Sequence, residues 1–217
     1  MHDLGMSRFF RTSDPPTATV LTPLPPTWWS RPYEYGWAQR FADADSTVLD
    51  AGCGVAHPFK FWLGTVCRRV VACDLDPRLI DLKALAHDLE TDLGVEDGAA
   101  FLAGYGKGIE AIQHSLCDLP FDDGTFDRIF CLSVFEHLSR GEQESALHEF
   151  HRLIGPAGLI VLTLDYPTVR LAELQYLIKN AGLEFAGPVD FTQPHEILKQ
   201  NGLRCFRAVL RREAEEG

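Results

Sequence analysis

The 217-residue sequence contains no CxxC pair, although it has six cysteines. Zinc sites and dithiol redox motifs need closely spaced cysteines, whereas an isolated cysteine in an apolar segment usually behaves as a small hydrophobic side chain. We therefore expect reduced thiols, no disulfide and no metal site. The cysteines are scattered, mostly in apolar segments, at Cys53, Cys67, Cys73, Cys117, Cys131 and Cys205.

A secretory signal and a membrane span are also missing from the sequence. Residues 1–16 have no apolar core of the signal-peptide type, and no later run approaches the ~20 apolar residues of a spanning helix. These two absences predict a cytoplasmic protein.

Basic residues are too few for a nucleic-acid partner. The chain has 20 Lys and Arg against 31 Asp and Glu, which gives a formal net charge of −11. Nucleic-acid affinity depends on basic side chains that displace counterions, so we expect no nucleic-acid partner for this chain. With 46% hydrophobic and 24% charged residues, the composition is typical of a globular protein with one substantial core.

The chain divides at residue 46. Residues 1–46 are rich in proline and aromatic residues and predict an arm or lid, with a short helix near Tyr33–Phe41. From residue 47 to 217, apolar strands alternate with amphipathic helices, which predicts an α/β, Rossmann-like, doubly wound sheet of seven strands with helices on both faces. The expected strands are 47–50, 69–73, about 110–117, 127–133, 159–164, 183–191 and 203–212.

Two of the expected helices have clear start signals. Asp76 and Pro77 provide an N-cap and a proline at the first helical position, followed by a leucine stripe that ends at Leu93. Ser139 and Glu142 have capping-box spacing and begin a helix that extends to residue 154. The glycine-rich segment 94–108 predicts a flexible loop at the surface or at the edge of the active site.

The stretch VLDAGCGVAHP, residues 48–58, predicts a strand, a glycine turn and a helix start. In an open parallel sheet, ligands bind where the first strand turns into its helix. A dinucleotide fingerprint needs a third glycine, but His57 and Pro58 stand where a pyrophosphate would approach. The turn is therefore a poor site for a nicotinamide cofactor.

The same stretch resembles the first motif, (V/L)LDxGCGxG, of the class I S-adenosylmethionine-dependent methyltransferases, with Ala56 in place of the last glycine. VVACDLDP resembles the second motif, and the resemblance covers about residues 47–165. It implies S-adenosylmethionine as the cofactor and an acid after the second strand that accepts bonds from the ribose hydroxyls. The implied cofactor contacts are Asp50, Gly52, Cys53, Gly54, Asp74 and Leu75.

Two later stretches resemble the third and fourth motifs. CDLPFDDGTFD implies that Asp118 binds the adenine amino group and that the Leu119 backbone N–H meets a ring nitrogen, although Asp118 could also be a simple turn carboxylate. FDRIFCLSVFEHL implies that Cys131 to Ser133 line the methionine portion. In this fold the segments 183–191 and 203–212 would be antiparallel sixth and seventh strands.

The residues after the fourth and fifth strands are the candidates for catalysis and substrate binding. His137 is the best-placed general base because an imidazole titrates near neutrality; the Glu136–His137 pair could equally shape the loop. We also assign Glu136, Asp165 and Tyr166 to the acceptor side.

The aromatic arm has two interpretations. Its aromatic side chains must pack on something, either the first helix of the sheet or the cofactor cleft as a lid. In the lid interpretation Arg31 or Tyr35 holds the methionine carboxylate and Trp37 borders the acceptor. A faint resemblance of SRPYEYGWA to glycan and secondary-metabolite methyltransferases favours a small-molecule or sugar-containing acceptor. The alternatives are a non-catalytic methyltransferase-like subunit and a nucleotide-dependent oxidoreductase.

Overall fold

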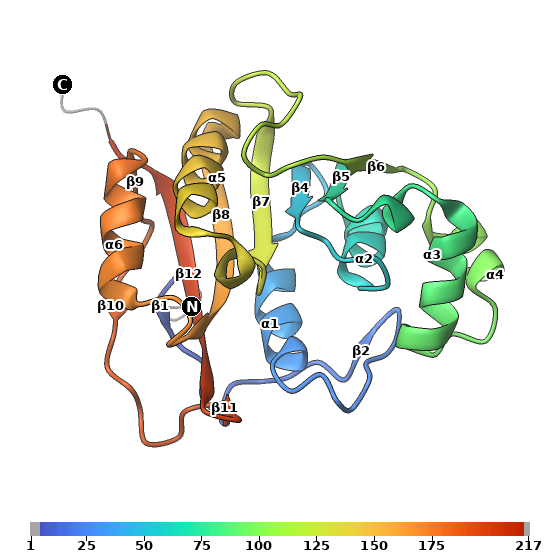
Figure 1. Cartoon of the computed structure of the whole chain (residues 1–217), viewed down its shortest axis with the longest axis horizontal. Helices are drawn as coiled ribbons and strands as arrows, with labels where there is room; N and C mark the ends of the chain where they lie inside the picture. The colour runs from blue at the N-terminus through green and yellow to red at the C-terminus, as the bar shows by residue number, and fades with distance from the viewer. Residues whose placement is uncertain (1–4, 215–217) are drawn as a thin grey trace.

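The computed structural model describes residues 5–214 and contains one large mixed sheet with helices on both faces (Figure 1). The strand order is β10-β1-β12-β8-β7-β4-β5-β6, and β9 and β11 pair with β12. The strands of this sheet are β1 (Ser7–Phe9), β4 (Thr47–Ala51), β5 (Arg69–Asp74), β6 (Ile109–Gln113), β7 (Phe126–Leu132), β8 (Ile154–Tyr166), β9 (Leu183–Phe185), β10 (Val189–Asp190), β11 (Lys199–Gln200) and β12 (Leu203–Arg212).

The remaining elements are a small ribbon and the helices. The ribbon pairs β2 (Thr19–Val20) with β3 (Thr22–Pro23). The α-helices are α1 (Arg31–Ala38), α2 (Phe59–Val66), α3 (Leu82–Asp88), α4 (Gly98–Tyr105), α5 (Arg140–Leu153) and α6 (Leu171–Asn180). Short 3₁₀ turns cover Gln39–Phe41, Pro77–Leu79 and Phe135–His137, and one wide helical turn covers Leu89–Leu93.

The two faces of the sheet are covered by different helices because neighbouring strand residues point to opposite sides. Leu49 packs with the apolar side chains of α5 and α6, whereas Val48 packs with those of α1 and α2. In Figure 1, α3 and α4 lie beyond the β6 end of the sheet. They form a smaller apolar cluster with Phe61 of α2.

Strands β4 to β8 are parallel, so their carboxyl ends meet at one edge of the sheet. At that edge Ala51, Asp74 and Leu132 end β4, β5 and β7. The fold thus brings the glycine turn, the acid after the second strand and the loop after the fourth strand together, as the α/β prediction requires.

The α/β doubly wound prediction is confirmed, with several differences in detail. Within residues 5–214 the sheet has ten strands, because short strands from the arm and the C-terminal region add to the seven expected. Strand β12 is antiparallel to β8, as predicted for the seventh strand. Strand β9, which begins the expected sixth strand, is antiparallel to β12 and therefore has the same direction as β4 to β8. The prediction of an antiparallel sixth strand is wrong. Gly187 and Pro188 interrupt the segment and divide it into β9 and β10.

Two helix predictions also need correction. The helix expected from residue 77 to 93 breaks near Ile80, because Asp81 provides a second N-cap by accepting bonds from the N–H groups of Lys83 and Ala84. The predicted loop 94–108 contains helix α4, which Asp97 caps through the Ala100 N–H. The run AAFLA favours a helix there despite the flanking glycines. Helix α5 has the predicted capping box.

The aromatic arm is integrated into the fold. Strand β1 lies inside the main sheet between β10 and β12, and helix α1 buries Tyr35 and Trp37 in the core. Residues 19–30 lie between these two anchored parts, and Thr27 to Ser30 border the cavities described below.

Candidate active site

The glycine turn after β4 has two positions whose backbone conformation favours glycine. Gly52 and Gly54 have φ values of 70° and 63°. A Cβ at Gly52 would lie 2.4 Å from Cγ1 of Val134, and a Cβ at Gly54 would lie 2.5 Å from the His57 ring. The N–H groups of Gly52 and Cys53 donate to the Cys73 carbonyl, 2.8 and 3.0 Å away. The two glycines therefore allow the turn to fold tightly against β5 and the loop after β7.

The carboxylate of Asp74 holds this turn in place. Its Oδ2 accepts a bond from the Gly54 N–H at 2.8 Å, and its Oδ1 accepts one from the Asp76 N–H at 3.1 Å. A carboxylate has about four acceptor positions, so two remain for a ligand. Asp74 lines two adjoining cavities, which have volumes of about 240 and 560 Å³.

The smaller of these cavities, which we call the cofactor cleft, is built mainly from predicted residues. It is bordered by the glycine turn, helix α1 and the loop after β7. Nine residues named from the sequence line it: Arg31, Tyr35, Asp50, Gly52, Cys53, Gly54, Asp74, Ser133 and His137; the others are His57, Phe59, Leu132 and Val134.

A buried ion pair fixes helix α1 to this edge of the sheet. Glu34 is fully buried, and its Oε2 accepts bonds from Arg31, Ser133 and Thr163 at 2.8, 2.9 and 2.7 Å. Burial alone would raise the pKa of Glu34, but Arg31 and the hydroxyl hydrogen bonds outweigh it and lower the pKa. Arg31 also donates to the Leu132 carbonyl at 2.9 Å. The guanidinium is thus held rigidly at the wall of the cofactor cleft.

His57 lies where the cavities meet. The hydroxyl of Tyr35 and Nδ1 of His57 share a hydrogen bond of 2.6 Å, and the ring of Trp28 stacks on the imidazole at 4.4 Å. Burial, Arg31 and Lys60 hold the pKa of His57 well below its usual range. This histidine is therefore neutral at physiological pH and forms part of a fixed aromatic wall.

A third cavity, of about 290 Å³, adjoins the cofactor cleft and is called the acceptor cavity here. Arg31, His57, Ser133 and His137 line both, so they form a common wall. The other residues that line the acceptor cavity are Thr27, Trp28, Trp29, Ser30, Glu136 and Asp165.

Two carboxyl groups line the acceptor cavity with oxygens that no hydrogen bond satisfies among the described residues. Glu136 is buried, and its Oε1 accepts from the Asp165 N–H at 3.2 Å, while its Oε2 has no partner there. Oδ1 of Asp165 is likewise buried and unpaired. Burial, with Glu34 and Asp165 nearby, raises the pKa of Glu136 to about 8. Burial and the nearby Glu34 also raise the pKa of Asp165.

Lys60 fixes the other side of the glycine turn from within the protein. Its ammonium donates to the carbonyls of Gly54, Val55 and His57 at 2.6, 2.8 and 2.8 Å. Burial lowers the pKa of this lysine although nearby carboxylates oppose the change. Burial raises the pKa of Asp50 to about 7 against the effect of Lys60, and Oδ2 of Asp50 has no partner among the described residues.

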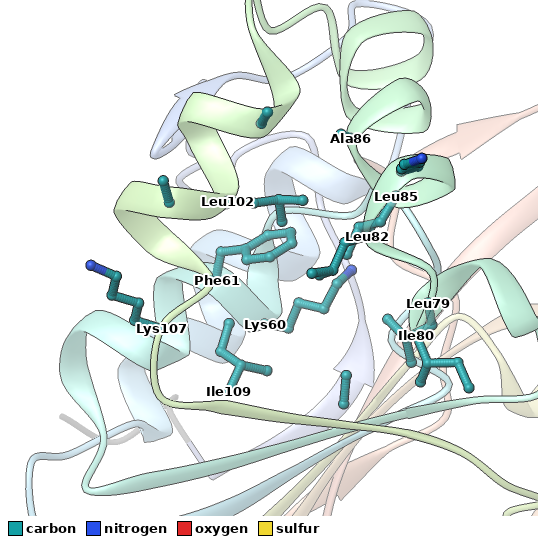
Figure 2. Close-up of a pocket in the computed structure, with 15 residues that line it drawn as sticks. Lys60, Phe61, Leu79, Ile80, Leu82, Leu85, Ala86, Leu102, Lys107 and Ile109 are labelled. Atoms are coloured by element: carbon teal, nitrogen blue, oxygen red, sulfur yellow. The ribbon is translucent and has the colours of Figure 1, made fainter.

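The stem of Lys60 also lines a separate apolar cavity of about 630 Å³ (Figure 2). Leu82 and Leu85 of α3 and Leu102 of α4 point into this cavity. Among the described residues, its lining shares no member with the cofactor cleft. The cavity therefore has a lining of its own, although Lys60 and Leu79 connect it to the glycine turn and to Cys53.

Several predicted site residues lie elsewhere. Asp118 is exposed, and the Leu119 N–H donates to Oε1 of Glu149 at 2.9 Å, so it is already bonded to the protein. The reason is spacing: β6 ends at Gln113, four residues before the expected end, and Ser115 and Leu116 follow it more closely than Asp118 does.

Three further residues point away from the cavities. Cys131 is fully buried on the α5 face, because the alternation along β7 turns Leu132 toward the cofactor cleft. Trp37 packs against Phe10 and Phe41 in the core. Tyr166 packs edge-on against Phe9, with ring centres 5.6 Å apart. Leu75 directly follows Asp74 at the carboxyl edge, and its side chain is 62% exposed.

The sequence interpretation missed other residues of the site. His57 was noted only as an obstacle to pyrophosphate, although its place in the glycine turn is the signal that could have identified it. Trp28 and Trp29 belong to the aromatic arm, but Trp37 was chosen instead. Lys60 had one available signal, which is its position as a lone charge in the apolar helix FKFWLG.

Comparison with known proteins identifies the family. Residues 49–162 match the family model described as "Methyltransferase domain". This chain belongs to the class I S-adenosylmethionine-dependent methyltransferases. The match covers just over half of the chain and includes the glycine turn, Asp74 and the Glu136–His137 pair.

Curated relatives of this chain carry the names of different methyltransferases. A protein of Encephalitozoon cuniculi named as a methyltransferase is 28% identical over 138 residues, which are 61% of this chain and 53% of that protein. A tRNA U34 carboxymethyltransferase of Cellvibrio japonicus is 28% identical over 54% of this chain and 32% of its own length. The chain thus spans about a third to a half of the length of the curated relatives it matches.

A solved structure supports the fold independently. The TehB-like S-adenosylmethionine-dependent methyltransferase of Corynebacterium glutamicum superposes with a TM-score of 0.58 at 21% identity, over 83% of this chain and 87% of that one. At this identity the similarity shows the fold. None of the helices described here is long and apolar enough to cross a bilayer. The described part of the chain also has no cluster of metal-ligating side chains.

The residues of the cofactor cleft fit S-adenosylmethionine. Asp74 has free acceptor positions for two ribose hydroxyls. Arg31 uses three of its five N–H groups on Glu34, Leu132 and Ser133, so two remain for a carboxylate. The unpaired Oδ2 of Asp50 could accept a bond from an ammonium group. The cleft thus offers partners for the ribose and for the carboxylate and ammonium groups of the methionine part.

Proposed function

We propose that this chain transfers the methyl group of S-adenosylmethionine to the oxygen, nitrogen or carbon of a small molecule or a sugar-containing metabolite in the cytoplasm. The observation that carries the proposal is the common wall of the cofactor cleft and the acceptor cavity. A nucleophile in the second cavity would lie directly beside a sulfonium in the first. No described helix could span a membrane, which is consistent with this location.

Each part of the chain has a proposed role in this reaction. Asp74 binds the ribose, Arg31 the methionine carboxylate and Asp50 the methionine ammonium. Bound S-adenosylmethionine supplies a methyl group that is already activated by the positive sulfur. The protein's task is to align the acceptor with this methyl group and to exclude water, which can lower a barrier by several kcal/mol.

His137 is the proposed general base when the acceptor needs one. It lines both cavities and lies at the exposed mouth of the site, where it can exchange protons with solvent. Glu136 and Asp165 are proposed to contact the acceptor.

Binding and turnover measured together test the proposal. We expect S-adenosylhomocysteine to bind in calorimetry, and we expect extracts with radiolabelled S-adenosylmethionine to yield a labelled small molecule. Binding without any labelled product in a broad set of extracts would favour the non-catalytic subunit. A protein that binds neither form of the cofactor would contradict both interpretations.

A further inference from the structure

The acceptor cavity has an acidic and aromatic lining. Its permanently cationic residue, Arg31, uses three N–H groups on Glu34 and on the carbonyls of Leu132 and Ser133, and its other two are assigned above to the methionine carboxylate of the cofactor. The carboxyl groups of Glu136 and Asp165 remain with one unpaired buried oxygen each among the described residues. Glu136 is only 8% exposed. A buried acceptor without a donor is costly, so a ligand that donates hydrogen bonds would stabilise this arrangement.

The walls of the cavity distinguish among ligand charges. A carboxylate or phosphate has no hydrogen-bond donor for the unpaired oxygens, and it would be repelled by Glu136 and Asp165 in their ionised forms. A hydroxyl could donate only one hydrogen bond, whereas an ammonium has three N–H donors and could reach both carboxyl groups. Trp28 and Trp29, which also line the cavity, favour a cation near their rings.

We propose that the methyl acceptor is a primary or secondary amine, held between Glu136 and Asp165 and facing the cofactor cleft across Arg31 and Ser133. This inference rests on the proposed function and adds the substrate class. The carboxyl pair binds the nitrogen, and the tryptophans cover the rest of the molecule.

Glu136 can also accept the proton that the ammonium must lose before its nitrogen can be methylated. The positive charge of a bound ammonium favours the ionised form of Glu136, whose burial otherwise raises its pKa to about 8. For an amine acceptor, Glu136 is therefore the base in place of His137: one N–H proton of the ammonium passes to Oε2 of Glu136, which leaves a lone pair on the nitrogen. That pair forms the bond to the methyl carbon while the carbon–sulfur bond breaks and its electrons stay on sulfur. The products are a methylated ammonium and a neutral thioether.

Matched ligands test this assignment. Phenylethyl, cyclohexylmethyl and n-butyl compounds are each used as amine, alcohol and carboxylate, and their binding to the full chain is measured by calorimetry with and without saturating S-adenosylhomocysteine. Charge-assisted hydrogen bonds predict that at least one amine binds about 10- to 100-fold more tightly than its alcohol. The carboxylates should bind most weakly. Methyl transfer from labelled S-adenosylmethionine should follow the same order.

Variants assign the preference to the carboxyl pair. Glu136→Gln and Asp165→Asn should each reduce the preference for amines to less than about threefold and leave the affinity for S-adenosylhomocysteine unchanged. Glu96→Gln removes an exposed carboxylate elsewhere and should change neither affinity.

The outcomes separate the inference from the function on which it rests. If no amine binds better than its alcohol, or if the preference survives in both variants, the assignment of an amine is wrong. If S-adenosylhomocysteine does not bind to the wild-type chain, the proposed function fails, while the preference for amines is still measured in the free protein.

Discussion

Asp74 has a structural role beside the ligand-binding role that we propose for it, because its two oxygens already accept bonds from the backbone of Gly54 and Asp76. Any substitution there affects the glycine turn as well as the free acceptor positions. Asparagine is the most informative replacement, since it keeps one oxygen acceptor and nearly the same shape.

We expect Asp74→Asn to weaken S-adenosylhomocysteine binding by about 1.5 to 3 kcal/mol, the usual contribution of a hydrogen bond to a charged group. Calorimetry measures this change directly. Asp97→Asn, which alters the exposed cap of α4, is the control and should leave the affinity unchanged. Equal affinity of the wild type and a folded Asp74→Asn variant would remove Asp74 from the site.

Lys60 should be a strong determinant of stability. Lys60→Met keeps the apolar stem but leaves the carbonyls of Gly54, Val55 and His57 without their donor. We expect the free energy of unfolding to fall by about 3 kcal/mol in urea denaturation, and we expect cofactor affinity to fall because the turn loosens. Lys107→Met, at the exposed rim of the apolar cavity, should change stability by less than ~0.5 kcal/mol. Similar results for the two variants would contradict this role.

The raised pKa of Glu136 predicts that the stability of the fold depends on pH. Its pKa is about 8 in the folded chain but about 4.3 in an unfolded one. Between these values the folded state keeps a proton that the unfolded state has lost, so the free energy of unfolding falls as pH rises. Glu34, Asp165 and Arg31 face this carboxyl group.

Urea denaturation at pH 5 to 9, without cofactor, measures the effect. Glu136 contributes a slope of up to ~1.4 kcal/mol per pH unit, which Glu136→Gln should remove. The slope that Asp50 contributes, with its pKa near 7, should remain in the variant. Parallel curves for the wild type and Glu136→Gln would show that Glu136 ionises normally in the folded chain.

At the scale of residues, the sequence predicts best which side chains line the cofactor cleft where a glycine or an acid follows a strand closely. Gly52 and Gly54 follow the end of β4 by one and three residues, and Asp74 ends β5, so an error of one or two residues in a predicted strand end does not move them out of the site. Asp118 was misplaced because β6 ends earlier than its apolar pattern suggested. Cys131 was misplaced because a shift of one residue along a strand reverses its face. Trp28 and Trp37 could not be distinguished, since only tertiary packing decides which tryptophan of the arm reaches the cavity.

At the scale of elements, the arm has two mechanically different parts. Strand β1 is hydrogen-bonded between β10 and β12, so it can leave only if the sheet opens. Residues 24–30 lack this anchoring, and Thr27 to Ser30 border the cavities. The lid predicted from the sequence is therefore confined to this second part in our proposal.

Hydrogen exchange tests the lid with an internal control. Saturating S-adenosylhomocysteine should increase the protection of amides in residues 24–30, because closure over the cofactor orders this segment. Amides of residues 7–10 should change little, since β1 is already in the sheet. Equal protection of residues 24–30 with and without ligand would show that the arm has only a structural role.

Element prediction failed where two local signals compete. In residues 94–108, five glycines suggested a loop, while the Asp97 cap and the run AAFLA formed α4. In residues 77–93, the leucine stripe suggested one helix, while the second cap at Asp81 divided it. Capping residues inside a periodic run would have predicted both outcomes.

For the whole molecule, charge gives the clearest expectation. With a net charge of −11, we expect no shift of duplex DNA or of bulk tRNA by micromolar protein at physiological salt, because the chain repels the phosphate backbone. Bulk tRNA is included in this gel-shift experiment because one relative carries a tRNA modification in its name. A salt-sensitive shift of either nucleic acid would overturn the expectation.

The position of β1 also has a consequence for biosynthesis. Arg8 of β1 pairs with Arg207 of β12, about 200 residues later in the chain. At the usual 5 to 20 residues per second, a ribosome needs roughly 10 to 40 s to make the intervening chain. During that time Phe9 and Phe10, which are buried in the finished protein, have no sheet to join. Nascent chains should therefore expose both phenylalanines to chaperones until the C-terminal strand emerges.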